Sequence, residues 1–134
     1  MLVSLDTNVW IFGIVGSDHF CEKILLNLSQ FEVIVPNQIR VELERNLSPK
    51  NLKKFYYFVN QFGVSLNYER IPEIYITMFE GKGLKKGDAI IGGFGEWRKV
   101  DKIVSDNRDF LRGLAPDHHF EVMSPQDFCM EFGL

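Results

Sequence analysis

The sequence predicts an α/β domain with a mainly parallel sheet, and three observations support this fold class. Short apolar runs alternate along the chain with longer stretches whose apolar residues recur at helical spacing. Serine or proline stands where several helices would begin, and glycine where some would end. With 134 residues and a hydrophobic content of 46%, the chain is long enough for a single domain, residues 1–134, with a substantial core.

Five strands are expected, each a short apolar run, at residues 2–5, 31–35, 64–66, 102–105 and 120–123. Helical patterns separate most of them, so the connections should be right-handed crossovers between parallel strands. Ligand sites in such sheets lie beyond the carboxyl ends of the strands.

Helical patterns are expected over about 18–29, 36–47, 49–62, from Pro72 to Gly81 and Gly83, within 86–100, and from Ser124 onward. Gly63 is a plausible cap for the third of these helices. In the stretch 86–100, Gly92, Gly93 and Gly95 would each weaken an isolated helix by about 1 kcal/mol. We therefore expect close packing against a neighbour there.

Composition excludes several classes of protein. The formal net charge of −3 argues against a general basic surface for nucleic acid, so any such contact must be local. Cys21 and Cys129 stand far apart without zinc-ligand spacing, which favours two buried thiols. The first ten residues carry Asp6 and no basic leader, so we expect neither a signal peptide nor a membrane span, and a cytoplasmic protein.

Acidic residues stand in four separate segments of the predicted fold. Asp6 ends the first strand, Glu42 lies in the helix after the second, and Asp88 opens the helix before the fourth. Asp106 and Asp109 follow the fourth strand. Because Mg²⁺ and Mn²⁺ prefer oxygen ligands, and phosphodiester hydrolysis needs several carboxylates on one rim, this pattern indicates a metal-dependent site.

Each acid also has an ordinary structural explanation. Asp6 is suited to a turn or a helix cap, and Asp88 to the positive end of a helix. Asp109 is suited to capping a short helix that begins at Phe110. Glu42 and Glu44 face different directions on one helix, so only one of them can join a common site.

The chain resembles the PIN domain family over nearly its whole length, and four spaced motifs carry the resemblance. They are Leu5-Asp6-Thr7-Asn8, Val41-Glu42-Leu43, Gly87-Asp88-Ala89-Ile90-Ile91, and the run from Ile103-Val104-Ser105 to Asp109-Phe110-Leu111. The resemblance implies a three-layer α/β/α sandwich around a central sheet of about five strands. It also implies Mg²⁺ or Mn²⁺ at the carboxylates, and cleavage of RNA. Many relatives of this size are toxins of VapBC toxin–antitoxin pairs, commonly dimeric and inhibited by a small partner protein.

The resemblance selects Asp6, Glu42, Asp88, Asp106 and Asp109 as catalytic candidates, with Asp6, Asp88 and Asp106 as metal ligands. Thr7, Asn8, Ser105 and Asn107 are supporting residues, and Lys85, Lys86 and Arg108 are weaker candidates for RNA phosphate contacts. One departure stands out, because Ser105-Asp106-Asn107 puts asparagine where many relatives have the acid. Either Asp106 turns to the metals, or Asn107 and Asp109 share that role through a water.

The features and the resemblance together predict a metal-dependent endoribonuclease that acts on RNA and forms a homodimer. The resemblance also implies a role as the toxin of a VapBC-type pair. The alternative is a non-catalytic PIN-like module that binds RNA or protein, and Asn107 is the reason to keep it. A phosphatase with a strand-end aspartate nucleophile is disfavoured, since such enzymes need a second aspartate at the position that Asn8 occupies.

Overall fold

The computed structural model describes residues 1–107, 110 and 117–134. Five strands form one sheet in the order β3-β2-β1-β4-β5, and every neighbouring pair is parallel. The strands are β1 Leu2–Leu5, β2 Glu32–Pro36, β3 Ser65–Asn67, β4 Lys102–Val104 and β5 Glu121–Met123. All five predicted strands are therefore present, within one residue of the expected bounds.

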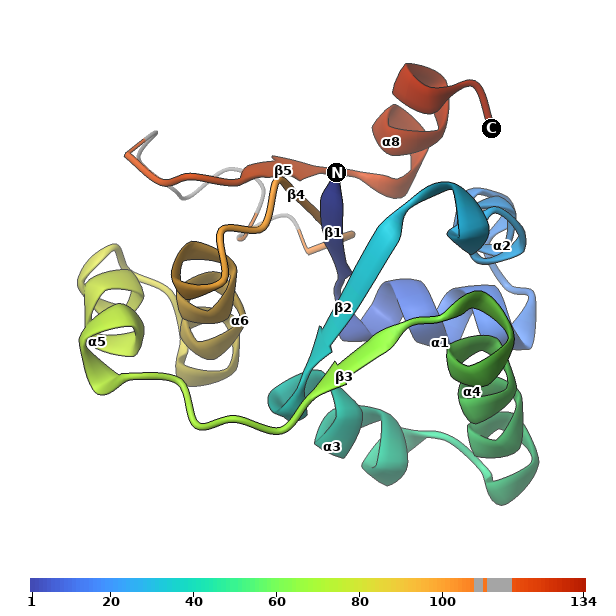
Figure 1. Cartoon of the computed structure of the whole chain (residues 1–134), viewed down its shortest axis with the longest axis horizontal. Helices are drawn as coiled ribbons and strands as arrows, with labels where there is room; N and C mark the ends of the chain where they lie inside the picture. The colour runs from blue at the N-terminus through green and yellow to red at the C-terminus, as the bar shows by residue number, and fades with distance from the viewer. Residues whose placement is uncertain (108–109, 111–116) are drawn as a thin grey trace.

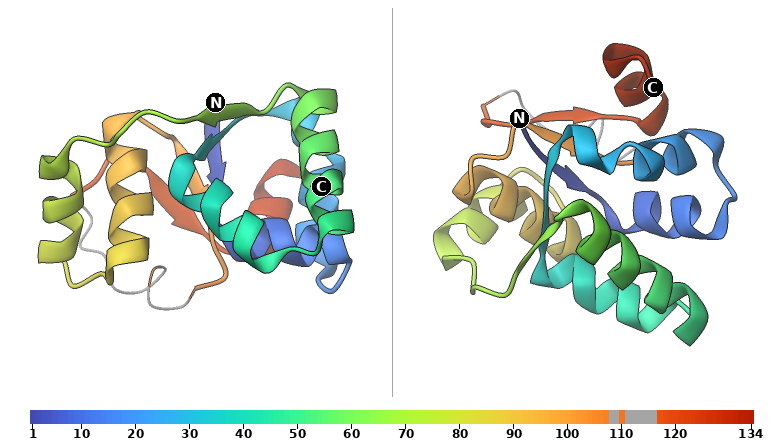
Figure 2. Two further views of the ribbon diagram at one scale, coloured as in Figure 1. Left: turned by 90° about the horizontal axis from the view of Figure 1, so that it is seen from below. Right: turned by 45° about the vertical axis from the view of Figure 1, so that its right-hand side comes forward.

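Helices cover both faces of this sheet (Figure 1). They are α1 Thr7–Val15, α2 His19–Leu26, α3 Asn37–Asn46, α4 Pro49–Phe62, α5 Glu73–Gly81, α6 Lys86–Trp97 and α8 Pro125–Phe132, with a 3₁₀ turn at Leu28–Gln30. The paired helices α5 and α6 lie on one side of the sheet and α1 and α2 on the other, which both views in Figure 2 repeat. The three-layer α/β/α sandwich is confirmed.

The strand order creates a switch point between β1 and β4. From β1 the chain moves outward to β2 and β3, then crosses back through α5 and α6 to β4 on the other side of β1. The connections that leave β1 and β4 therefore diverge, which opens a crevice at their carboxyl ends. Asp6 follows β1 directly, and Ser105 follows β4.

Helix α1 is the element that sequence patterning did not predict. Its apolar residues occupy all sides, and Val9, Trp10 and Ile14 are buried, so no one-sided stripe marks it as a helix. The Trp10 ring meets Phe55 of α4 edge-on, with ring centroids 5.0 Å apart. Enclosure of α1 by its neighbours overrides the low helix propensity of its β-branched residues.

The helix expected over about 18–29 is shorter than predicted. It is α2, which ends at Leu26, and the 3₁₀ turn follows. The other helices begin and end close to their predicted bounds, and Gly63 caps α4 with a φ of 66°.

The glycines of α6 allow close packing, as expected. A Cβ built on Gly92 would lie 2.8 Å from Cδ1 of Phe79, and one on Gly93 would lie 3.1 Å from the backbone of Tyr75. Both contacts belong to α5, so the absence of side chains brings the two helices together. This packing sets the position of the first turn of α6, which carries Asp88.

Both cysteines are buried free thiols, as predicted. No helix in the described part of the chain is long and apolar enough to cross a membrane.

Filling the space at Gly92 should destabilise the protein. Phe79 is fully buried and its ring is stacked on Phe120, so it cannot move aside for a new side chain. Gly92→Val should lower the free energy of unfolding by about 2 kcal/mol, measured by urea denaturation. Gly81→Val is the matched control, since nothing lies within 4 Å of its Cβ position, and it should change stability by less than about 0.5 kcal/mol. Equal effects of the two changes would contradict the packing argument.

Candidate functional site

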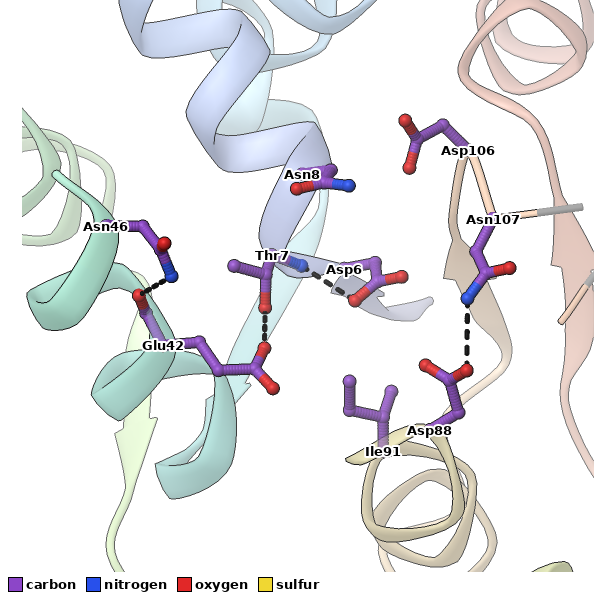
Figure 3. A pocket seen from close by; sticks show the side chains of 9 residues that line it. All are labelled: Asp6, Thr7, Asn8, Glu42, Asn46, Asp88, Ile91, Asp106 and Asn107. Atoms are coloured by element: carbon purple, nitrogen blue, oxygen red, sulfur yellow. Dashed lines mark hydrogen bonds between the residues drawn. The ribbon is translucent and has the colours of Figure 1, made fainter. Parts of the chain in front are cut away.

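The crevice at the switch point holds an open cavity of about 520 Å³, which we call the carboxylate cavity (Figure 3). It is lined by Asp6, Thr7, Asn8, Glu42, Asn46, Asp88, Ile91, Asp106 and Asn107. Four of the five acids predicted from the sequence therefore meet here, carried by the ends of β1 and β4, by α3 and by α6. Asp109 and Arg108 lie outside the described residues. Lys85 and Lys86 are exposed at the start of α6 but are not among the lining residues.

Asp6 is the most deeply set of these acids, with 7% of its surface exposed. Its backbone N–H donates to the Val104 carbonyl, which extends the ladder between β1 and β4. One carboxylate oxygen accepts from the Thr7 backbone N–H at 2.8 Å and so caps α1, and the other accepts from the Ser105 hydroxyl at 2.7 Å. The side chain is thus held from both strands of the switch point.

Burial raises the pKa of Asp6 to about 6, from an ordinary value of 3.8. The hydrogen bonds from Ser105 and Thr7 act in the opposite direction, while the negative charges of Asp88 and Glu42 raise the pKa further. The described groups around Asp6 therefore do not fully offset the cost of burying its negative charge.

Glu42 is the α3 carboxylate that enters the cavity. The Thr7 hydroxyl donates to its Oε2, and the Gln38 side-chain amide donates to Oε1 at 2.9 Å. Glu44 faces away and instead accepts from Arg40 at 2.8 Å and from Tyr56 at 2.9 Å. The expectation that only one of Glu42 and Glu44 joins the cavity is confirmed.

Asp88 stands in the first turn of α6, where its Oδ2 accepts a hydrogen bond from the Asn107 side-chain amide at 3.0 Å. Asp106 also lines the cavity, and its Oδ1 is buried with no hydrogen-bond partner in the described part of the chain. Asp106 and Asn107, the two candidates for the acid position after β4, thus both line the cavity. Asp106 contributes a carboxylate and Asn107 an amide.

Sequence reasoning missed three residues of this region. Gln38 supports Glu42 from four positions earlier on the same helix, a spacing that marks neighbours on a helix face. Asn46 and Ile91 also line the cavity. Asn46 lies four positions after Glu42, so the same spacing points to it, whereas no sequence signal distinguishes Ile91 from a core residue.

The residues that line the cavity have the type of ligand atom that a divalent cation requires. All the candidate ligands are oxygen donors, which Mg²⁺ and Mn²⁺ prefer, and the unpartnered Asp106 oxygen and the raised pKa of Asp6 both indicate uncompensated negative charge. Within the described ranges, no three carboxylate, histidine or cysteine groups stand close enough together to hold an ion. Binding a cation therefore requires these carboxylates to turn toward one another.

Comparison with known proteins identifies the fold. No family model matches this sequence, and no curated protein matches it. Two similar solved structures are VapBC2 from Rickettsia felis bound to a DNA fragment from their promoter and DNA-bound VapBC from Salmonella typhimurium. The first has 18% identity and a TM-score of 0.67, and the match covers 92% of this chain and 99% of that one. The second has 23% identity and a TM-score of 0.68, with coverage of 93% and 99%.

The chain has a PIN-like fold. The match extends over nearly the whole of both neighbouring chains, in agreement with the extent of the sequence resemblance. At these identities the likeness is one of architecture, so the catalytic and metal-binding roles of Asp6, Glu42, Asp88 and Asp106 stay predictions.

The buried charge of Asp6 should make stability depend on pH in the absence of metal. Below about pH 3.8 the carboxyl is protonated in both folded and unfolded states and costs nothing. As the pH rises to about 6 the unfolded chain ionises first, so stability falls, and above pH 6 the whole cost is present.

Asp6→Asn removes that cost and retains an oxygen to cap α1. In buffer with chelator at pH 7.5 the variant should therefore be more stable than the native chain by roughly 2 kcal/mol, and the difference should vanish near pH 4. Urea denaturation across this pH range measures it. A destabilised variant at pH 7.5, or a gain that persists unchanged at pH 4, would contradict the account.

Proposed function

We propose that this chain is a metal-dependent endoribonuclease that hydrolyses RNA phosphodiester bonds with Mg²⁺ or Mn²⁺. One observation carries the proposal: four carboxylates from four separate segments line a single open cavity at the switch point of the sheet. Structural carboxylates are dispersed among basic partners, whereas Asp6, Glu42 and Asp106 have no Lys or Arg ion pair in the described part of the chain.

Neighbouring groups of the chain fix the orientation of three of the carboxylates. Ser105 and the start of α1 hold Asp6, Thr7 and Gln38 hold Glu42, and Asn107 holds Asp88. A bound divalent cation supplies Lewis acidity that activates water and neutralises the charge that develops on the phosphate.

Each carboxylate keeps oxygen lone pairs that these neutral donors do not use. Lys85 and Lys86, exposed at the start of α6, are suited to contact the phosphates of an RNA strand that enters the open cavity.

A toxin role in a VapBC-type pair is the second part of the proposal. It is supported by the two structural neighbours, both of which are VapBC assemblies by their descriptions, and by the matching chain length. In this role a small antitoxin protein would bind and inhibit the chain. A homodimer is also proposed, and the exposed Ile74 and Met78 on α5 offer an apolar surface for it.

A non-catalytic binding module is the competing function, and two observations favour it. Asn107 occupies the position of an acid, and the carboxylates do not converge on one point in the described part of the chain. This function predicts RNA or protein binding without turnover.

Cleavage of a mixed pool of single-stranded RNA tests the nuclease directly. The native chain should cut in Mg²⁺ or Mn²⁺ and not in chelator. Glu42→Gln, Asp6→Asn and Asp88→Asn should each lower the rate about a hundredfold or more, because each removes a charge from the carboxylate cavity.

Glu44→Gln is the matched control for Glu42→Gln. It makes the same chemical change two residues along the same helix, but Glu44 bonds to Arg40 and Tyr56 outside the cavity. Its cleavage rate should stay within about threefold of native, because exposed ion pairs contribute little. If the folded native chain does not cleave RNA in either metal, the binding module is favoured. If Glu42→Gln and Glu44→Gln lose equal activity, the carboxylate cavity is not the site of cleavage.

Expression in a bacterial host tests the toxin role. Induction of the native chain alone should slow growth, and Glu44→Gln should do the same, while Asp6→Asn should not, because RNA cleavage is lost with the carboxylate. Growth curves and the integrity of total RNA are the measurements. Unimpaired growth at comparable soluble expression of all three chains would reject the toxin role while leaving the nuclease open.

A further inference from the structure

Helix α4 carries charge of one sign only. Its residues, Pro49–Phe62, include Lys50, Lys53 and Lys54 and no aspartate or glutamate, in a chain whose net charge is −3. All three lysines are exposed, and none of them has an ion pair in the described part of the chain. A solvated helix face usually carries both signs of charge, so that neighbouring residues attract each other. The uniform charge of α4 therefore needs another explanation.

The three lysines stand where their charges are unfavourable for the helix. Lys50 is three residues before Lys53 and four before Lys54, and these spacings bring like charges together on one helix face. Lys50 also lies in the first turn, where the unpaired backbone N–H groups already carry partial positive charge, and no acid stands in that turn. A bound anion would relieve both repulsions, so the charges of α4 indicate an anionic partner.

An open groove of about 520 Å³ lies on the same helix. It is lined by Pro49, Leu52, Lys53, Tyr56, Tyr57 and Asn60. Tyr57 has 61% of its surface exposed, and it follows Lys53 by four residues and Lys54 by three. These spacings place its ring next to both lysines on the helix surface. We call Lys50, Lys53, Lys54 and Tyr57 the α4 basic face.

An acid that reaches the edge of this groove is already paired. The Tyr56 hydroxyl donates to Oε1 of Glu44 at 2.9 Å, which ties one ring of the groove to α3. The same oxygen accepts from Arg40 at 2.8 Å. Glu44 is therefore compensated by a residue of its own helix, and the lysines of the α4 basic face keep their charge for a ligand.

The groove begins close to the carboxylate cavity. Asn46, the last residue of α3, lines the cavity, and Pro49, the first residue of α4, lines the groove. They are three positions apart in the sequence, so their Cα atoms are at most about 11 Å apart. Figure 1 shows the chain turning from α3 through a short connection into α4. A polymer held in the cavity can therefore continue onto α4.

We propose that the α4 basic face binds single-stranded RNA beside the carboxylate cavity, with the lysines at the phosphates and Tyr57 stacked on a base. A positively charged groove with exposed aromatic rings is the usual surface for single-stranded nucleic acid, because every base has a flat face that can stack. This inference rests on the proposed ribonuclease function, and names the surface that holds the substrate outside the cavity. It also supplies the local basic contact that an acidic chain requires.

Binding of a labelled single-stranded RNA of about 12 nucleotides, measured by fluorescence anisotropy in chelator, tests the inference without cleavage. Lys50→Gln, Lys53→Gln and Lys54→Gln combined should weaken binding at least about tenfold at low salt. The slope of log affinity against log salt should become shallower by about 2, because each phosphate contact contributes about 0.7 on a single strand. Tyr57→Leu should weaken binding about tenfold and leave that slope unchanged.

Lys99→Gln is the matched control for the single change Lys53→Gln. Both remove one exposed lysine charge, but Lys99 precedes β4 at the amino edge of the sheet, away from the cavity, and its side chain is 64% exposed. Lys53→Gln should reduce the salt slope by about 0.7, whereas Lys99→Gln should leave it unchanged. Urea denaturation should show the lysine variants of α4 to be at least as stable as the native chain, since like charges are removed.

Polyglutamate of equal charge tests the other class of ligand, an acidic protein segment. It has no bases, so it should bind the native chain at least about tenfold more weakly than the RNA does, and Tyr57→Leu should not change its affinity. Polyglutamate binding as tight as that of RNA, with no effect of Tyr57→Leu on RNA, would overturn the inference and indicate an acidic protein partner. Unchanged RNA affinity in the triple lysine variant would also overturn it.

RNA cleavage in Mg²⁺ or Mn²⁺, measured in parallel, separates this inference from the proposed function. The triple lysine variant should raise KM for a long RNA and keep kcat within about threefold of native, because the lost contacts lie outside the cavity. Cleavage by the native chain with no effect of the α4 changes on RNA binding rejects only the inference. The expected losses of binding without cleavage by the native chain reject only the nuclease.

Discussion

A buried carboxylate at the end of the central strand is the constraint around which the rest of the site is arranged. Asp6 continues the ladder of β1 and β4 through its backbone, and its side chain caps α1. The Ser105 hydroxyl binds the same carboxylate from the end of β4. Sheet pairing, the start of α1 and the geometry of the cavity therefore meet at one residue, and burial opposes the ionised form of its side chain.

Neutral groups donate hydrogen bonds to three acids of this cavity, Asp6, Glu42 and Asp88. A hydroxyl and a backbone N–H serve Asp6, and an amide serves Asp88. Such donors fix the direction of a carboxylate without cancelling its charge, so the field of the cavity remains negative.

Packing between α5 and α6 sets the position of one of these acids. The small residues of α6 let α5 approach closely, with Phe79 against Gly92 and Tyr75 against Gly93. The first turn of α6 then lies beside α3, where a Cβ at Gly87 would be 3.6 Å from Oε1 of Glu42. The distance between Asp88 and Glu42 is thus controlled by apolar packing on one face of the sheet.

The sequence by itself determined the strands, most helices and four acids of the cavity, because these depend on local periodicity, caps and the rule that parallel strands present their carboxyl ends on one edge. It did not reveal α1, whose apolar residues on every side leave no periodic signal, nor the support that Gln38 provides to Glu42. The order Asp106-Asn107 could not be interpreted from sequence alone, since either side chain can face the cavity. Only the tertiary structure decided that both do, because the contacts of Asn107 with Asp88 and Phe110 join segments whose relative placement depends on the packing of the whole sheet.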